Sequence, residues 1–167
     1  MKQKTKKVVD IKEVQDKSQR EIVKVTNPDY LLKEISPMVY EFAGKINLPG
    51  ISYESLMSYF LYSAGIEVYV GLVDGKPKGF MSIGIMGAPY YSTAIVHSIY
   101  KPEPDPILAD MMYDTFADFM KTHKLIYHYY IAVDKKTGKY FADKAKERNI
   151  TATCMGYYFS GKRTFKR

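Results

Sequence analysis

The chain has 167 residues, of which 46% are hydrophobic and 26% charged, a composition typical of one globular domain with its own core. No apolar run reaches the length that spans a bilayer, and no apolar segment follows the lysine-rich first residues, so neither a membrane span nor a secretory signal is expected. A single cysteine, Cys154, excludes an internal disulfide framework, indicates a reducing compartment such as the cytoplasm, and is expected to be a small buried side chain. No metal is expected, because the three histidines and one cysteine lack ligand spacing.

The formal net charge of +7 is concentrated at the two ends of the chain. We expect residues 1–19 to form a basic arm, residues 20–163 to form one domain, and residues 164–167 to form a basic tail. Both ends favour an acidic partner such as nucleic acid; the alternative is a pair of solubilising tails. The basic residues concerned are Lys4, Lys6, Lys7, Lys162 and Arg163.

Residues 21–25 alternate as a short strand. Asn27 and Pro28 then form a helix start, and Pro37 is expected to kink or split the helix that follows. A second helix begins after the cap residue Ser52.

The hydrophobic period then changes to that of strands, at residues 66–73, 79–86 and 91–100. Asp74 and Gly75 lie in a turn, residues 74–77, that makes the first two strands a hairpin. A cleanly amphipathic helix begins near Ile107. It is followed by a strand at 125–133 that is apolar on both faces and expected inside the sheet, a basic helix at 138–148, and two short strands at 150–155 and 157–162. The order β-α-α-β-β-β-α-β-α-β-β predicts an α/β (α+β) fold with a mixed, mostly antiparallel sheet covered by helices.

The loop at residues 101–106 joins a strand to a helix, a place where free backbone N–H groups often hold a phosphate. Here Asp105 is a natural cap that satisfies those donors itself, and Pro106 has no N–H to give. Glu103 adds negative charge, and no glycine lets a ligand approach the backbone. The sequence therefore predicts a loop hostile to anions.

The element order over residues 21–163 resembles that of the GNAT superfamily of acyl-CoA-dependent N-acyltransferases. The hairpin at residues 68–80 is similar to the family's second and third strands, and Asn149-Ile150 before a strand is similar to the end of its last helix. The resemblance implies that acetyl-CoA is the cofactor and that its pyrophosphate is held by a glycine-rich loop, where this chain has the residues of 101–109. It also implies an Asn and a thiolate-protonating Tyr on the basic helix, but Gly138 and Ala145 stand at those positions.

Candidate site residues follow from the same resemblance. His97 and Glu67 are candidates for the base that deprotonates an amine, and Tyr140 is a candidate substitute for the missing Tyr; the alternative for each is a structural side chain. Ile99, Lys101 and Lys139 are the candidates for contacting coenzyme A.

The sixteen tyrosines suggest an interaction surface, for which Tyr90 and Tyr91 are the best candidates. Ordinary packing of tyrosine in the sheet is the alternative.

Two hypotheses follow. The first is a catalytically silent GNAT-like module, a pseudoenzyme without cofactor that serves assembly or binding with a protein partner or a second copy of itself. It would reside in the cytoplasm or, if viral, in a bacteriophage virion. The alternative is a divergent N-acetyltransferase that moves an acyl group from acyl-CoA to an amine. Separation of the strands at 91–100 and 125–133, with an open tunnel beside Ile99, favours the enzyme; a tunnel filled by Tyr127 or Tyr129 favours the silent module. A third hypothesis, nucleic-acid binding, requires both basic ends on one face.

Overall fold

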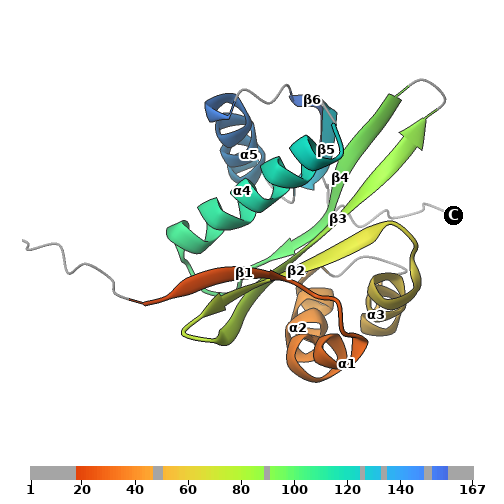
Figure 1. The fold of residues 1–167 in the computed structure, drawn as a ribbon, viewed down its shortest axis with the longest axis vertical. Coiled ribbons are helices and arrows are strands. Elements are labelled where there is room, and N and C mark those ends of the chain that lie inside the picture. Colours follow the sequence, from red (N-terminus) through yellow and green to blue (C-terminus); the bar gives the residue numbers. More distant parts are fainter. Residues whose placement is uncertain are drawn as a thin grey trace, which may run out of the picture.

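A computed structural model describes residues 18–46, 51–88, 91–124, 127–132, 135–148 and 152–157. These ranges form a sheet of strand order β1-β2-β3-β4-β5-β6, covered by helices on both faces (Figure 1). The strands are β1 (Arg20–Lys24), β2 (Ile66–Val73), β3 (Lys76–Ala88), β4 (Tyr91–Tyr100), β5 (Tyr127–Ala132) and β6 (Ala152–Tyr157). The helices are α1 (Pro28–Tyr30), the π-helix η1 (Leu31–Ile35), α2 (Ser36–Ile46), α3 (Tyr53–Tyr62), α4 (Pro106–Thr122) and α5 (Lys135–Glu147).

The sheet is mixed, as expected. The pairs β1–β2, β2–β3 and β3–β4 are antiparallel, whereas β4–β5 and β5–β6 are parallel because a helix crosses over between each of those pairs. The strand predicted at 125–133 does lie inside the sheet, with β4 on one side and β6 on the other.

Local signals account for most element boundaries. Asp74 and Gly75 both have positive φ (50° and 75°), which gives the β2–β3 hairpin the two-residue turn that matches strand twist. The turn is shorter than the predicted 74–77, so β3 begins at Lys76 rather than at residue 79. The Ser52 side chain caps α3 through the Ser55 amide, as expected.

The helix in which a kink or a split was expected at Pro37 changes from π to α geometry just before that residue. The π-helical segment η1 directly precedes α2, in which Pro37 is the second residue. Since proline has no N–H and its ring crowds the preceding turn, a widened turn lets the helix continue through it.

Two predictions near the C-terminus were wrong in detail. Helix α5 begins at Lys135 rather than at 138, because Gly138 is accommodated within its first turns instead of starting it. Residue 157, expected to start a second strand, continues β6 through Gly156; the rest of that expected strand lies outside the described residues.

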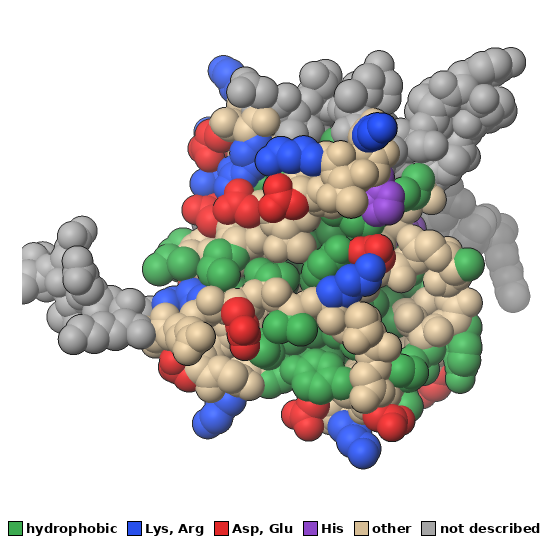
Figure 2. Space-filling view, in the orientation of Figure 1, with side chains coloured by type: hydrophobic (Ala, Val, Ile, Leu, Met, Phe, Trp, Pro, Cys, Tyr) green, Lys and Arg blue, Asp and Glu red, His purple; other side chains and the backbone are tan. Residues whose placement is uncertain are grey.

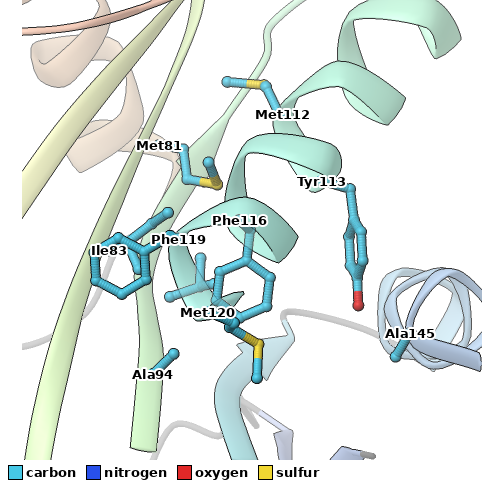
Figure 3. Packing of buried hydrophobic residues seen from close by; sticks show 10 residues of the cluster. Met81, Ile83, Ala94, Met112, Tyr113, Phe116, Phe119, Met120 and Ala145 are labelled. Atoms are coloured by element: carbon cyan, nitrogen blue, oxygen red, sulfur yellow. The ribbon is translucent and has the colours of Figure 1, made fainter. Parts of the chain in front are cut away.

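The sheet separates two hydrophobic clusters. On one face α4 packs with a stripe of buried side chains, including Met112, Phe116 and Met120, against Met81 and Ile83 of β3 (Figure 3). On the other face η1, α2 and α3 bury Leu31, Ile35, Val39, Met57 and Phe60 against β2, β3 and β4. None of the helices in the described ranges combines the length and the apolarity needed to cross a bilayer.

Candidate functional site

The strands β4 and β5 separate partway along their length. Their parallel pairing ends with Val96 opposite Tyr130, although β4 continues to Tyr100 and β5 to Ala132. On its other side β4 stays paired with β3 as far as Tyr100. The edge of β4 from His97 to Tyr100 that faces β5 is therefore unpaired within these two described strands, and its backbone groups can pair with a ligand that enters in extended form.

A β-bulge lies where the two strands begin to separate. Ile83 is opposite Val96 and Ser82 is opposite Ser98, so His97 is the extra residue of β4. A bulge redirects the side chain that it carries, which makes it a common device beside active sites. Here it turns His97 toward the face of the sheet that α3 covers.

The His97 ring is held between two neighbours. The Tyr59 hydroxyl oxygen of α3 lies 2.9 Å from Nδ1 and 3.0 Å from Nε2. Gly84 of β3 lies beneath the ring, because a Cβ built there would be 2.8 Å from Nε2. Partial burial lowers the pKa of His97, so the imidazole is neutral near pH 7 and able to accept a proton.

A pair of buried serines fixes the register beside the bulge. Ser82 and Ser98 are 0% and 6% exposed, and their hydroxyl oxygens are 2.5 Å apart. One hydroxyl donates to the other, so the two buried groups share a hydrogen bond within an otherwise apolar layer.

The N-terminus of α4 is closed by its own residues. Asp105 is the cap, and its Oδ1 accepts a hydrogen bond of 2.9 Å from the Leu108 amide. Pro106 is the first helical residue, as predicted. The first intrahelical hydrogen bond runs from the Ala109 amide to the Asp105 carbonyl, so the amide positions 106–108 precede it. Of these three, Pro106 has no N–H and the Leu108 N–H already donates to Asp105.

Arg20 of β1 holds the same carboxylate. Its Nε donates to Asp105 Oδ2 at 2.9 Å, and its Nη1 donates to the Ser18 carbonyl at 3.1 Å. The two charged side chains are only 10% and 17% exposed. Burial alone would raise the pKa of Asp105, but the Leu108 amide and the Arg20 guanidinium outweigh it and lower that pKa.

Two cations in and near this loop are also engaged. Lys101 donates to the Glu103 carbonyl at 2.9 Å, and burial lowers its pKa. Lys78 of β3 pairs with the Glu103 carboxylate at 3.2 Å. Ile99, the neighbouring candidate on β4, is half-buried and packs against the α4-side cluster.

Glu67 and His97 cannot serve one substrate together, because they lie on opposite faces of the sheet. Glu67 faces a cavity of about 350 Å³ under the C-terminal half of α4. There it pairs with Lys24 at 2.7 Å and accepts a hydrogen bond from the Tyr69 hydroxyl. Burial would raise the pKa of Glu67, but these two donors lower it, so the carboxylate is a poor proton acceptor.

Tyr140 is tied to α4. Its hydroxyl donates to Asp110 at 2.9 Å, and burial together with that carboxylate raises its pKa to about 12. Lys144 pairs with the same Asp110 at 2.9 Å, and Arg148 pairs with Asp114 at 2.6 Å. Figure 2 shows acidic and basic side chains side by side where α5 lies against α4. These contacts tie α5 to α4 and engage the Tyr140 hydroxyl with Asp110.

Of the remaining candidate residues, some are described by the structure and others lie outside the described residues. Lys139 is on the exposed side of α5, 3.8 Å from Asp143. Tyr91 is the first residue of β4, but nothing is described of its side chain. Tyr90 and the basic residues of the two ends lie outside the described residues, as do the side chains of Cys154, Tyr127 and Tyr129.

Sequence reasoning missed Tyr59, Gly84 and Arg20. The only local signal for Gly84 was a glycine within a strand, which often marks a bulge or a close approach. The partners of Tyr59 and Arg20 are 38 and 85 residues away in the chain, so no local pattern identifies them.

Several solved structures that share this fold are acetyltransferases. A probable acetyltransferase superposes with a TM-score of 0.62 at 15% identity, over 88% of this chain and 94% of that one. An aminoglycoside acetyltransferase from an uncultured soil metagenomic sample, in complex with sisomicin, gives 0.57 at 16% identity, over 86% and 97%. A predicted acetyltransferase with acetyl-CoA from Clostridium acetobutylicum gives 0.58 at 12% identity, over 89% and 96%.

No protein-family model matches the sequence, and no curated protein sequence matches it significantly. At these identities the structural matches show the fold, and the predicted GNAT fold is confirmed. The loop before α4 does not fit the pyrophosphate of coenzyme A, because a carboxylate, a proline and an internal ion pair occupy the place of free donors.

Proposed function

We propose that this GNAT-fold chain is an N-acyltransferase in which the neutral imidazole of His97 removes a proton from the acceptor amine. The observation that carries the proposal is the position of His97, at the bulge where β4 and β5 separate. The unpaired edge of β4 is the place for an extended thioester donor. His97 is then next to the point where the acyl group would end.

The step proposed is aminolysis of a thioester. The imidazole takes a proton from the ammonium form of the amine, and the nitrogen lone pair attacks the thioester carbonyl carbon. The C–N bond forms, the C–S bond breaks, and the sulfur leaves with the bonding electron pair, while the attacking nitrogen loses its second proton to water and becomes the amide nitrogen. The imidazolium or a water molecule returns a proton to that sulfur. Tyr140, the candidate for this protonation, is not assigned the role because its hydroxyl donates to Asp110.

Tyr59 is a positioning residue in this scheme. Its hydroxyl can donate to the unprotonated nitrogen of the resting imidazole, which stabilises the neutral ring and fixes its orientation. Loss of that hydrogen bond should move the acidic limb of the pH–rate profile to higher pH. A purely structural role of Tyr59 would leave the limb unchanged.

The test is thiol release from S-acetylpantetheine and from acetyl-CoA, with an amine panel of sisomicin, a lysine peptide and a polyamine. General base catalysis contributes about 10²–10⁴-fold, so His97→Asn should lower kcat/KM by at least about 100-fold. His123→Asn is the matched control, because His123 is exposed at the end of α4 and should stay within about twofold of wild type. Turnover of His97→Asn at the wild-type rate would contradict the assignment.

A second candidate is a non-catalytic GNAT-fold module with an assembly or binding role. The closed N-terminus of α4 favours it, because that helix end offers an anionic carrier little to bind. Absence of thiol release with every donor and amine, from folded protein, would support this candidate over the enzyme. Association with a virion remains a prediction on which none of the described residues bears.

A further inference from the structure

We infer that the acyl donor is recognised through its pantetheine thioester alone, and that the pyrophosphate of acyl-CoA contributes no binding at α4. The inference rests on the proposed acyl transfer and specifies its donor class. Any acyl-pantetheine thioester should serve, whether or not a nucleotide is attached.

The first argument concerns hydrogen-bond donors. A helix N-terminus binds phosphate through the N–H groups of its first turn. In α4 the first of these is absent at Pro106 and another is taken by Asp105 Oδ1, 2.9 Å from the Leu108 nitrogen. The carboxylate of Asp105 thus occupies the place that an anionic ligand would take.

The second argument concerns charge. A phosphate at this end of α4 would approach the carboxylate of Asp105 and that of Glu103, whose side chain is 70% exposed. Like charges brought together in a partly buried site repel each other strongly. Asp105 cannot simply rotate away, because Arg20 binds its other oxygen at 2.9 Å and is itself only 10% exposed.

The third argument concerns the cations that might compensate. Lys101 is directed to the Glu103 carbonyl, and Lys78 to the Glu103 carboxylate. On α5, Lys144 and Arg148 are committed to Asp110 and Asp114. Each would have to give up a contact made in the free protein before it could bind a phosphate, which reduces the net gain.

The unpaired edge of β4 does not share these obstacles. It carries backbone N–H and C=O groups from His97 to Tyr100, and Ile99 offers half-buried apolar surface beside them. The pantetheine arm contains two amides in an extended chain, which can pair with such an edge as a strand does. Recognition therefore lies close to the reacting carbonyl.

The test compares kcat/KM for acetyl-CoA and S-acetylpantetheine with the same amine. We expect the two values to agree within about threefold. Two phosphate contacts would change the ratio of the two kcat/KM values by about 100-fold or more, at tenfold per 1.4 kcal/mol. A preference of that size for acetyl-CoA would therefore overturn the inference and leave the proposed acyl transfer intact. Release of no thiol from either donor would instead reject the proposed function.

A direct titration keeps the inference testable in that last case. Inorganic pyrophosphate is titrated into the wild-type protein by calorimetry, and no binding is expected at millimolar concentration. Binding that Arg20→Met abolishes would overturn the inference, whatever the turnover. In Asp105→Gly combined with Pro106→Ala, which restores amide donors and releases Arg20 from residue 105, pyrophosphate affinity should rise at least tenfold. If that variant does not fold, the donor comparison and the pyrophosphate titration of the wild-type protein still show whether the pyrophosphate contributes to binding.

Discussion

The contact between Arg20 and Asp105 can be tested by removing one charge while keeping the helix cap. In Asp105→Asn the side-chain oxygen can still accept from the Leu108 amide, because asparagine caps helices as well as aspartate does. What is lost is the charge of Asp105 in its ion pair with a guanidinium that is 10% exposed. Breaking a buried ion pair from one side destabilises a protein by about 3–5 kcal/mol. Because Arg20 keeps its bond to the Ser18 carbonyl, we expect a smaller loss than this, about 2–3 kcal/mol.

Two further variants separate the cap from the ion pair. Asp105→Ala also removes the cap and should lose about 1 kcal/mol more. Asp118→Asn is the matched control on the same helix, because its pair with Lys121 is exposed (73% and 76%) and is expected to contribute under about 0.5 kcal/mol. The measurement is urea denaturation at pH 7, followed by circular dichroism, with unchanged m-values required for comparison.

The pH dependence gives an independent check. The folded state lowers the pKa of Asp105, so its contribution to stability is present above the unfolded-state pKa of about 3.9 and is lost as pH falls through the folded value. The difference between wild type and Asp105→Asn should therefore be constant near neutrality and shrink below about pH 4. A difference under about 0.5 kcal/mol at pH 7 would refute the reasoning, because Arg20 would then not hold the carboxylate in place.

Two predictions concern the surroundings of His97. Gly84→Ala places a Cβ 2.8 Å from His97 Nε2 and 2.5 Å from the Ile66 side chain, so it should displace the ring, lower kcat and destabilise the protein by about 1–3 kcal/mol. The control Gly44→Ala has open space around its Cβ and should be neutral or stabilising. Equal kcat values in the two variants would contradict the placement of Gly84 against the His97 ring. Ser98→Ala leaves the buried Ser82 hydroxyl without its partner and should destabilise by about 1–3 kcal/mol in thermal denaturation, whereas the double variant with Ser82→Ala should lose less. Strictly additive losses would show that the hydroxyls do not satisfy each other.

Much of the fold could be predicted because its signals are local. The Asp74–Gly75 turn, the Ser52 cap and the Asp105–Pro106 helix start each depend on residues within one turn of chain. The closed loop before α4 could be predicted for the same reason. Asp105 and Pro106 act through their own backbone positions, whatever the rest of the chain does.

The arrangement around His97 could not be predicted in the same way. The bulge exists only relative to the pairing of β3 with β4, and Tyr59 reaches the ring from a helix on another segment. A histidine on a strand therefore pointed only weakly to a site, and Glu67 appeared equally suitable. The structure places the two residues on different faces of the sheet: His97 faces α3, whereas Glu67 lies under α4 and pairs with Lys24.

The N-terminus of α4 and the unpaired edge of β4 together indicate which parts of a donor could contribute binding energy. An enzyme that acts on a large donor can use contacts far from the reacting bond to raise its rate. Here the N-terminus of α4, where such a contact would form, is occupied by Asp105, Pro106 and Arg20. The unpaired edge of β4 and His97 lie together at the point where β4 and β5 separate, which is where the proposed transfer would take place. If transfer occurs, its specificity must arise from the acyl group, the thioester arm and the amine, and the donor KM should be high and insensitive to the nucleotide.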